Sequence, residues 1–181
     1  KPFKVSEVTS QILYGEKFKI LSKNKKWIKI KTSFDNYIGY IKNREYTDNY
    51  NPTHKVSNLK TEIYKKPNIK TKHFLPFLSK ISILNQNKKF IEFEKNKWIK
   101  KKDVKKIKHV EKNYLKILKL FLKSKYLWGG KTYKGIDCSA ILQLFFYYNN
   151  KFYPRDTKDQ IRYAKKIKKK IFKKGDIIFW K

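Results

Sequence analysis

Cys138 is the only cysteine in this chain of 181 residues, and its surroundings are those of a reactive thiol. Asp137 precedes it directly, and the apolar run AILQLFFYY follows it at residues 140–148. If this run is a helix, the thiol lies in its first turn, where the positive end of the helix dipole favours the thiolate. A thiolate is the form of cysteine that attacks carbonyl carbons. Without its neighbours, however, the thiol would be equally compatible with a small buried side chain, the usual role of free cysteine.

Other motifs accompany Cys138 in the last third of the chain. Gly129 and Gly130 follow an aromatic segment and predict a loop. A carboxylate directly ahead of a helix, as at Asp137, is a favourable N-cap, and capping is compatible with binding a substrate. Trp128 we interpret as a core aromatic residue. Gly175 is followed by an apolar run at residues 177–180, which predicts a buried strand.

Two helices and this strand are expected to position the thiol. Apolar residues at three- and four-residue spacing predict a helix between about residues 110 and 122. Residues 138–148 are apolar on nearly every side, so the second predicted helix must be buried. Together these elements predict an α+β module over residues 109–181.

Ahead of residue 109 the pattern changes to short strands. Residues 3–46 alternate apolar runs, the first at residues 11–14, with turns rich in Gly, Asn and Asp. Residues 54–107 repeat the order strand, polar turn, strand and a closing Trp strand, and the turn-forming residues 47–53 separate the two units. We therefore predict a fold of the α+β class with two small β-barrels, at residues 1–48 and 53–108, ahead of the module at 109–181.

The formal charge of +33 does not by itself indicate a nucleic-acid partner. Only three of the 47 basic residues are arginine, and the lysines are spread along the whole chain. Nucleic-acid readers usually gather basic residues on one face and use arginine for bidentate contacts. The excess of lysine accompanies abundant Ile, Asn, Phe and Tyr, a profile typical of an A+T-rich genome. We predict no specific nucleic-acid partner, only weak and salt-sensitive attraction to polyanions.

The sequence predicts neither a transmembrane segment nor a bound metal. It has no run of 18 apolar residues and no cluster of His, Cys and Asp at ligand spacing, so we expect no cofactor. A single cysteine cannot form an internal disulfide, which leaves the redox compartment undiagnosed. The chain does not begin with methionine, and we expect it to be part of a longer gene product.

The last third of the chain resembles the NlpC-type cell-wall cysteine peptidases, which have a papain-like α+β fold. Four motifs in order carry the resemblance: YLWGG at 126–130, GIDCS at 135–139, PRDT with Gln160 at 154–160, and GDIIF at 175–179. One departure is Ala140, where the family commonly has glycine. The two β units resemble bacterial Src-homology-3-type domains, with LYGE at 13–16 and YIGY at 37–40 in the first. The whole is similar to γ-D-glutamyl-L-diamino acid endopeptidases that carry two such domains ahead of the peptidase module, of which residues 109–181 would be an incomplete copy.

This resemblance implies a thiol protease, a hydrolase that cuts the bond between γ-D-glutamate and a diamino acid in peptidoglycan stem peptides. Cys138 would attack the carbonyl and form a thioester that water releases. Tyr126 would stand near the thiol and help to place the substrate or stabilise the oxyanion. Asp137 and Ser139 would line the pocket for the substrate's amino end.

The resemblance also implies that the first β unit completes this pocket with Glu16 and Tyr37. From the residues alone, Glu16 is more often a turn carboxylate, and Tyr40 competes with Tyr37 because neighbouring strand positions face opposite sides. The implied partner is a stem peptide or muropeptide with a free N-terminal L-alanine. That preference implies cell-wall recycling and a cytoplasmic location, in preference to a periplasmic or extracellular one.

A catalytic histidine is needed to take the thiol proton and return it to the leaving amine. The resemblance places it shortly after the GDIIF motif, whereas His54, His73 and His109 all lie upstream. We therefore expect a chain truncated before its base, with a nucleophile but no complete active site. The alternative is a non-catalytic protein that binds cell wall or muropeptide.

Overall fold

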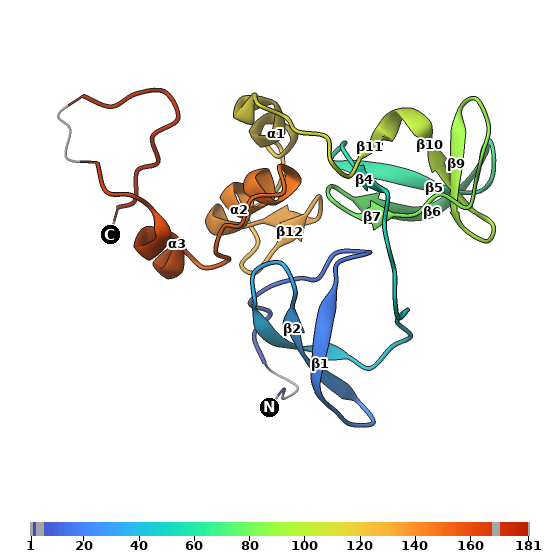
Figure 1. Ribbon diagram of the computed structural model, residues 1–181, viewed down its shortest axis with the longest axis horizontal. Coiled ribbons are helices and arrows are strands. Elements are labelled where there is room, and N and C mark those ends of the chain that lie inside the picture. The colour runs from blue at the N-terminus through green and yellow to red at the C-terminus, as the bar shows by residue number, and fades with distance from the viewer. Residues whose placement is uncertain (1, 3–5, 168–170, 181) are drawn as a thin grey trace.

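The computed structural model describes residues 2, 6–167 and 171–180. Antiparallel sheets occupy the first two thirds of the chain, and the three α-helices of the described residues follow in the last third (Figure 1). The predicted α+β class is therefore confirmed. No described helix is both long and apolar enough to cross a membrane.

The first β unit is a three-stranded antiparallel sheet. Its strands, paired in sequence order, are β1 (Phe18–Lys23), β2 (Trp27–Thr32) and β3 (Ile38–Lys42). The side chain of Asn24 closes the first turn, because its oxygen accepts hydrogen bonds from the backbone N–H groups of Lys26 and Trp27. In β2 the alternate residues Ile28 and Ile30 are buried, as expected for a strand with one face on a core.

Residues 11–14 do not form the predicted strand. They are irregular and lead into a turn at Gly15, whose φ of +72° is in the left-handed region. A Cβ atom on Gly15 would lie 2.1 Å from the backbone oxygen of Lys80, so glycine is required for this close approach. The apolar side chain of Leu13 is buried all the same, which explains why the pattern indicated a strand.

The second β unit contains two open sheets. One has the order β6-β5-β10-β9-β8 and the other the order β11-β4-β7. The elements are β4 (His54–Val56), β5 (Lys60–Lys66), β6 (Ile69–Pro76), β7 (Lys80–Ile81), β8 (Asn85–Gln86), β9 (Phe90–Glu94), β10 (Lys97–Lys100), the 3₁₀ turn η1 (Lys101–Asp103) and β11 (Val104–Lys106). Neither β unit closes into a barrel in the described strand pairing, although both follow the predicted order of short strands and turns.

The last third contains α1 (Tyr114–Leu120), the short hairpin β12 (Lys131–Thr132) and β13 (Gly135–Ile136), α2 (Cys138–Tyr148) and α3 (Thr157–Tyr163). The predicted helix at 138–148 is confirmed to the residue. The predicted buried strand at 177–180 is wrong: these residues are not in a strand, and Trp180 is 84% exposed. A buried strand needs neighbours on a sheet, and no described strand pairs with this segment.

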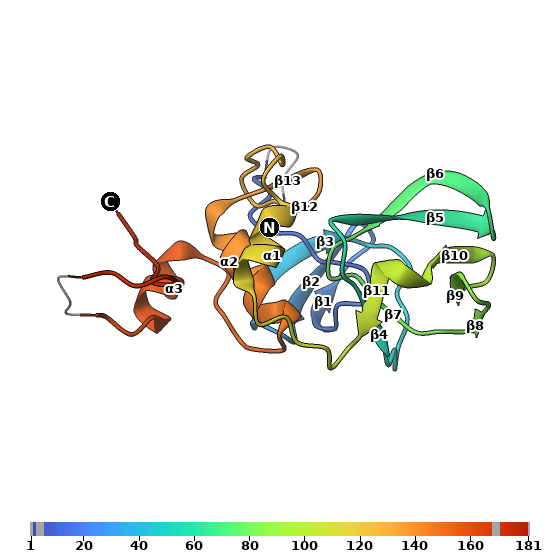
Figure 2. The same cartoon turned by 90° about the horizontal axis from the view of Figure 1, so that it is seen from above.

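One hydrophobic core joins all three parts of the molecule. It lies around α2, which is central in Figures 1 and 2, with the first sheet on one side and the second β unit on another. Its buried members come from every part: Leu13, Phe77, Leu78, Ile117, Phe121, Ile136, Ala140, Leu144, Tyr147 and Tyr148. Phe34 of the first unit packs against them and stacks on the Tyr147 ring, with the centroids 3.6 Å apart. The second β unit has a further core of its own. The boundaries at residues 48, 53 and 109 stay a prediction, because this shared core crosses them.

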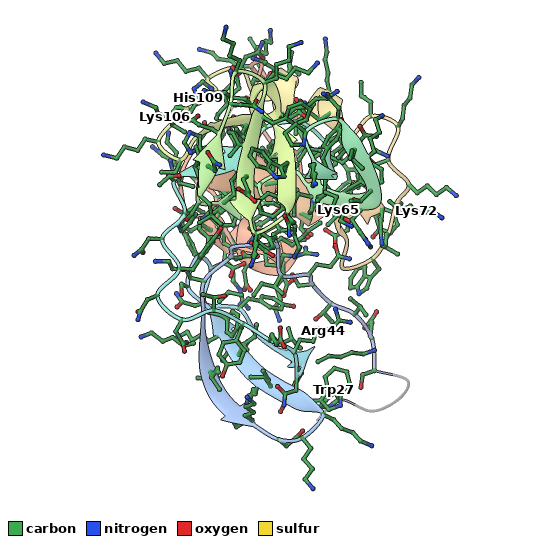
Figure 3. The ribbon with its side chains drawn as sticks, turned by 90° about the vertical axis from the view of Figure 1, so that its right-hand side faces the viewer. Trp27, Arg44, Lys65, Lys72, Lys106 and His109 are labelled. Atoms are coloured by element: carbon green, nitrogen blue, oxygen red, sulfur yellow. The ribbon has the colours of Figure 1, made fainter. Side chains whose placement is uncertain are left out.

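The basic side chains do not gather on one face. Figure 3 shows Lys65 and Lys72 on one flank of the second β unit and Lys106 on the other, with further side chains pointing outward all around.

Candidate active site

Cys138 is the first residue of α2, and its side chain is exposed. Its sulfur lies 3.9 Å from the hydroxyl oxygen of Thr157, the first residue of α3. The thiol thus stands where two helices begin, one of them largely buried, and it faces solvent. An accessible thiol at a helix N-terminus is suited to nucleophilic attack, and the alternative of a small buried side chain is excluded.

Asp137 fixes the start of this helix. Its Oδ1 accepts hydrogen bonds from the backbone N–H of Ala140 at 2.8 Å and from the hydroxyl of Ser139 at 3.1 Å. Its Oδ2 accepts from the backbone N–H of Gly129 at 2.9 Å. One carboxylate therefore caps α2 and ties the loop before it to the helix.

Arg155 holds the same carboxylate from the opposite side. Its two terminal nitrogens donate to Oδ1 and Oδ2 of Asp137 at 3.0 and 2.7 Å, in a bidentate ion pair. Among the described ion pairs, Arg155 is paired with Asp137 and not with Asp156, its neighbour in the sequence. Burial alone would raise the pKa of Asp137, but the hydrogen bonds from Arg155 and Ala140 outweigh it and hold that pKa below its ordinary value.

These contacts bear on the predicted pocket for the substrate's amino end. Asp137 is 6% exposed and Ser139 7% exposed, and both oxygens of Asp137 are already occupied by protein donors. The hydroxyl of Ser139 also accepts from Arg155 at 2.8 Å. The described contacts thus assign both residues to building the site, and a direct contact of either with substrate stays a prediction.

Gln160 locks the two helices together. Its side chain is fully buried, and its amide nitrogen donates to the backbone oxygens of Ser139 and Pro154, each at 2.9 Å. The PRDT motif and Gln160 therefore act as one unit: they place α3, and with it Thr157, beside the thiol.

Tyr37 and Asp156 face each other on the same side of the molecule as this helix junction. Asp156 is the N-cap residue of α3 and directly precedes Thr157. The hydroxyl of Tyr37 interacts with the carboxylate of Asp156 and with Thr9, and burial raises the pKa of both Tyr37 and Asp156. Asp156 makes no ion pair within the described residues, unlike Asp137.

Sequence reasoning did not single out Asp156 as a site residue. The available signal was its position directly before Thr157, within the PRDT motif. Within the described residues it forms no ion pair, and burial raises its pKa although the charge of Arg155 acts to lower it.

Glu16 lies within the protein, at the junction of the first unit and the last third. Its Oε2 accepts from the backbone N–H of Leu13 at 2.8 Å, and its Oε1 lies 3.6 Å from the Nζ of Lys131, with both side chains 2% exposed. The turn role that the residue type suggested is thus observed. Lys131 already neutralises the carboxylate, and the predicted role of Glu16 in binding substrate stays a prediction.

Tyr126 and Trp128 are exposed by 67% and 58%. Trp128 is therefore not the core residue that we expected. Tyr126 forms an isolated parallel bridge with Ile136, two residues before the thiol, which keeps its segment next to the site. The structure shows no contact between the Tyr126 phenol and Cys138 among the described hydrogen bonds.

None of the three histidines is bonded to the thiol in the described residues. His109 packs its ring against Tyr148, at the opposite end of α2 from Cys138, with the centroids 6.2 Å apart. His54 is in β4 and His73 is in β6. The histidine that the resemblance implies falls past Lys181, outside the described residues. The described part also holds no group of three His, Cys, Asp or Glu side chains that could bind a metal ion.

Comparison with known proteins finds two family matches. Residues 123–181 match the NlpC/P60 family, and residues 1–45 match the bacterial dipeptidyl-peptidase Sh3 domain. Each match covers a third of the chain or less. The first range contains Cys138, Thr157 and Gln160, and the second contains Glu16 and Tyr37. The candidate site therefore takes residues from both matched ranges.

Two curated relatives are named as peptidases. A probable endopeptidase NlpC homolog of Haemophilus influenzae is 41% identical over 61 residues, which cover 32% of this chain and 32% of that protein. A gamma-D-glutamyl-L-lysine dipeptidyl-peptidase of Bacillus subtilis is 38% identical over 60 residues, 33% of this chain and 20% of that protein.

A solved structure shares the fold over most of the chain. The crystal structure of an NlpC/P60 family protein from Bacillus cereus superposes with a TM-score of 0.76 over 92% of this chain and 63% of that one, at 19% identity. The chain therefore spans about a third or less of the curated relatives, and less than two thirds of this structural relative.

Proposed function

We propose that this chain is the nucleophile-bearing part of a cysteine peptidase that cuts the γ-D-glutamyl–diamino acid bond of peptidoglycan stem peptides. The observation that carries the proposal is the exposed thiol of Cys138 at the N-terminus of α2, within the NlpC/P60 segment. The names of the relatives, endopeptidase and gamma-D-glutamyl-L-lysine dipeptidyl-peptidase, support peptide hydrolysis and suggest the bond.

In the proposed reaction the Cys138 thiolate attacks the γ-carbonyl carbon of D-glutamate. The C–N bond to the diamino acid breaks, its amine leaves with a proton, and a thioester to Cys138 remains. Water then hydrolyses the thioester, releases the acid and restores the thiol. We propose that the backbone N–H groups at the start of α2, ahead of those of Ala140 and Ile141 that Asp137 already binds, stabilise negative charge close to the sulfur.

We propose that Asp156 and Tyr37 bind the free ammonium of the N-terminal L-alanine. A carboxylate with a raised pKa and no counter-ion is stabilised by an incoming ammonium, and a phenol that already faces it adds an acceptor. Asp137 and Glu16 are less suited, since Arg155 and Lys131 already neutralise them. A preference for free L-alanine favours a recycling role, and with it a cytoplasmic location.

The test is hydrolysis of L-Ala-γ-D-Glu-diamino acid peptide, followed by mass spectrometry of the released diamino acid. The complete gene product is expected to release it, and Cys138→Ser is expected to reduce the rate at least ~10³-fold, since the nucleophile is gone. Ser82→Ala, which removes a surface hydroxyl far from the thiol, serves as the matched control and should keep its rate. Equal rates for Cys138→Ser and the unaltered protein would show that Cys138 is not the nucleophile.

The 181-residue polypeptide by itself is expected to react with alkylating agents but not to turn over. None of the described histidines contacts its thiol, so the proton transfer to the leaving amine has no donor. A second candidate function is a protein that binds muropeptide without cutting it. Binding of the peptide by the complete gene product, with no release of diamino acid over days, would support that alternative.

A further inference from the structure

The segment at residues 8–13, which the sequence suggested was in part a strand, crosses the loop that leads to Cys138. We call it the strap. Figure 1 shows it passing beside β12 on its way from the N-terminus to the first sheet. A Cβ atom on Gly129 would lie 2.0 Å from the backbone oxygen of Val8, so the strap backbone lies directly against the glycine loop. Gly129 is the residue whose N–H is bound by Asp137.

Two side chains of the strap each accept one hydrogen bond from the last third of the chain. The hydroxyl of Ser10 accepts from the Nε of Arg155 at 3.0 Å, and the side-chain oxygen of Gln11 accepts from the backbone N–H of Lys131 at 2.8 Å. Leu13 is buried in the core around α2. The strap thus contacts the glycine loop, the hairpin after it and the arginine that grips the helix cap.

Ser10 binds the one guanidinium nitrogen of Arg155 that does not bind Asp137 or Ser139. The two terminal nitrogens of Arg155 bind Asp137 and Ser139, and Nε points to Ser10. Because the guanidinium is planar and rigid, fixing Nε fixes the orientation of both terminal nitrogens. Arg155 is 3% exposed, so water is a poor substitute for the Ser10 hydroxyl.

We propose that Ser10 and Gln11 are positioning residues for the Cys138 thiol. The strap acts through Arg155 and through the glycine loop to hold Asp137, and Asp137 sets the first turn of α2. The N-terminal part of the chain is in this view a component of the active site, in addition to any part that its sheet has in binding substrate. The inference deepens the proposed function, since it assigns these residues to the geometry of the proposed nucleophile.

The test measures alkylation of Cys138 by iodoacetamide in the 181-residue chain between pH 5 and pH 10, by intact mass. This readout needs no peptide hydrolysis, so it stands even if the proposed peptidase activity fails. The double variant Ser10→Ala, Gln11→Met is expected to react at least ~5-fold more slowly at pH 7, with the midpoint of its pH profile moved to higher pH. A loss of about 1 kcal/mol in the hold on Asp137 corresponds to that factor. Ser10→Thr, which keeps the hydroxyl acceptor, is expected to retain most of the rate that the single variant Ser10→Ala loses.

Ser82→Ala is the matched control, because its hydroxyl also makes one hydrogen bond, to the backbone oxygen of Asn51, away from the thiol. It should melt at a slightly lower temperature with an unchanged pH profile. The double variant could likewise lose thermal stability while the pH profile of its alkylation stays the same as that of the unaltered chain. In that case the strap has only a structural role, and the proposal is wrong. Should the double variant not fold, as judged by circular dichroism, the single variants Ser10→Ala and Ser10→Thr decide between the same two outcomes.

Discussion

The carboxylates of this site differ in whether a counter-ion is already bound to them. Arg155 holds Asp137 in a buried bidentate pair, and Lys131 lies beside Glu16. Breaking a buried pair by removing one partner leaves an uncompensated charge and costs about 3–5 kcal/mol, so such residues chiefly maintain structure. Asp156 has no such partner among the described residues, and it is the carboxylate left available to a ligand.

The Asp156→Asn variant tests that distinction. For peptides with a free N-terminal L-alanine we expect the complete gene product to show KM raised about 10-fold or more, because a charge-assisted hydrogen bond contributes about 1.5–3 kcal/mol. For the same peptide with an acetylated N-terminus, which has no ammonium, KM should be the same in both proteins. Steady-state kinetics on the two peptides measures this difference. An equal loss on both peptides would mean that Asp156 acts on the structure of the site and does not bind the ammonium.

The residue identities could be predicted from the sequence, but their partners could not. Cys138, its helix and the cap at Asp137 follow from local pattern, since a cap and an apolar run are adjacent in the chain. The pairing of Asp137 with Arg155 joins residues 18 positions apart, and that of Glu16 with Lys131 joins the first β unit to the last third of the chain. Such pairings depend on tertiary structure, which no local pattern specifies.

At the level of elements, the last turn of α2 is held by two lysines from one strand pair. Lys55 of β4 and Lys80 of β7 are direct register partners. The Nζ of Lys55 donates to the backbone oxygens of Tyr148 and His109 and lies 4.2 Å from the centre of the Tyr148 ring. The Nζ of Lys80 donates to the hydroxyl of Tyr147 at 2.8 Å and lies 4.2 Å from that ring. Cations at the C-terminal end of a helix are favoured by its dipole.

Burial of these two amines makes stability depend on pH. Desolvation lowers the pKa of Lys55 and of Lys80 to about 8, whereas an unfolded lysine titrates near 10.4. Between those values the unfolded state binds more protons, so the free energy of unfolding must rise with pH. The charge of Glu16 opposes the lowering of the Lys80 pKa, and the charges of Lys17 and Lys131 add to it. The charge of Lys80 adds to the lowering of the Lys55 pKa.

We therefore expect the free energy of unfolding to rise by about 2–3 kcal/mol for each of the two lysines between pH 7.5 and pH 10. Above pH 10 it should fall again, because burial raises the pKa of Tyr148 to about 12 and the unfolded tyrosine loses its proton first. Urea denaturation at pH 7.5, 9 and 10 measures the slope. Lys55→Met should reduce it, and Lys60→Met, which removes an exposed lysine stacked on Phe74, should leave it unchanged. A flat profile in the unaltered chain would contradict the assignment.

Among the elements, those set by local periodicity could be predicted and those set by neighbours could not. The helix at 138–148 and the run of short strands follow from apolar spacing. Residues 11–14 and 177–180 have the same apolar spacing without a pairing partner, and neither forms a strand. Whether a strand-like run pairs depends on the presence of an adjacent edge, and the same holds for the predicted barrels, whose closure requires edges to meet.

In the whole molecule, the core around α2 depends on parts that the sequence assigned to separate domains. Leu13 and Phe34 enter from the first unit, and Phe77 and Leu78 enter from the second. Fully burying one such side chain contributes about 1.5–3 kcal/mol, so the four together approach the total stability of a typical domain. The second β unit differs, because its further core lies almost wholly within its own strands.

This asymmetry predicts which part of the chain folds alone. Residues 53–108, expressed by themselves, should show a cooperative thermal transition in near-ultraviolet circular dichroism, at a lower temperature than in the whole chain because Phe77 loses its cover. Residues 109–181 should show none, since α1 and α2 would expose the side that Leu13, Phe34, Phe77 and Leu78 cover. Adding a separate polypeptide of residues 1–108 should restore a transition and slow the proteolysis of residues 109–181. If residues 109–181 melt cooperatively without it, the two β units are accessory modules, and the catalytic helix does not depend on their packing.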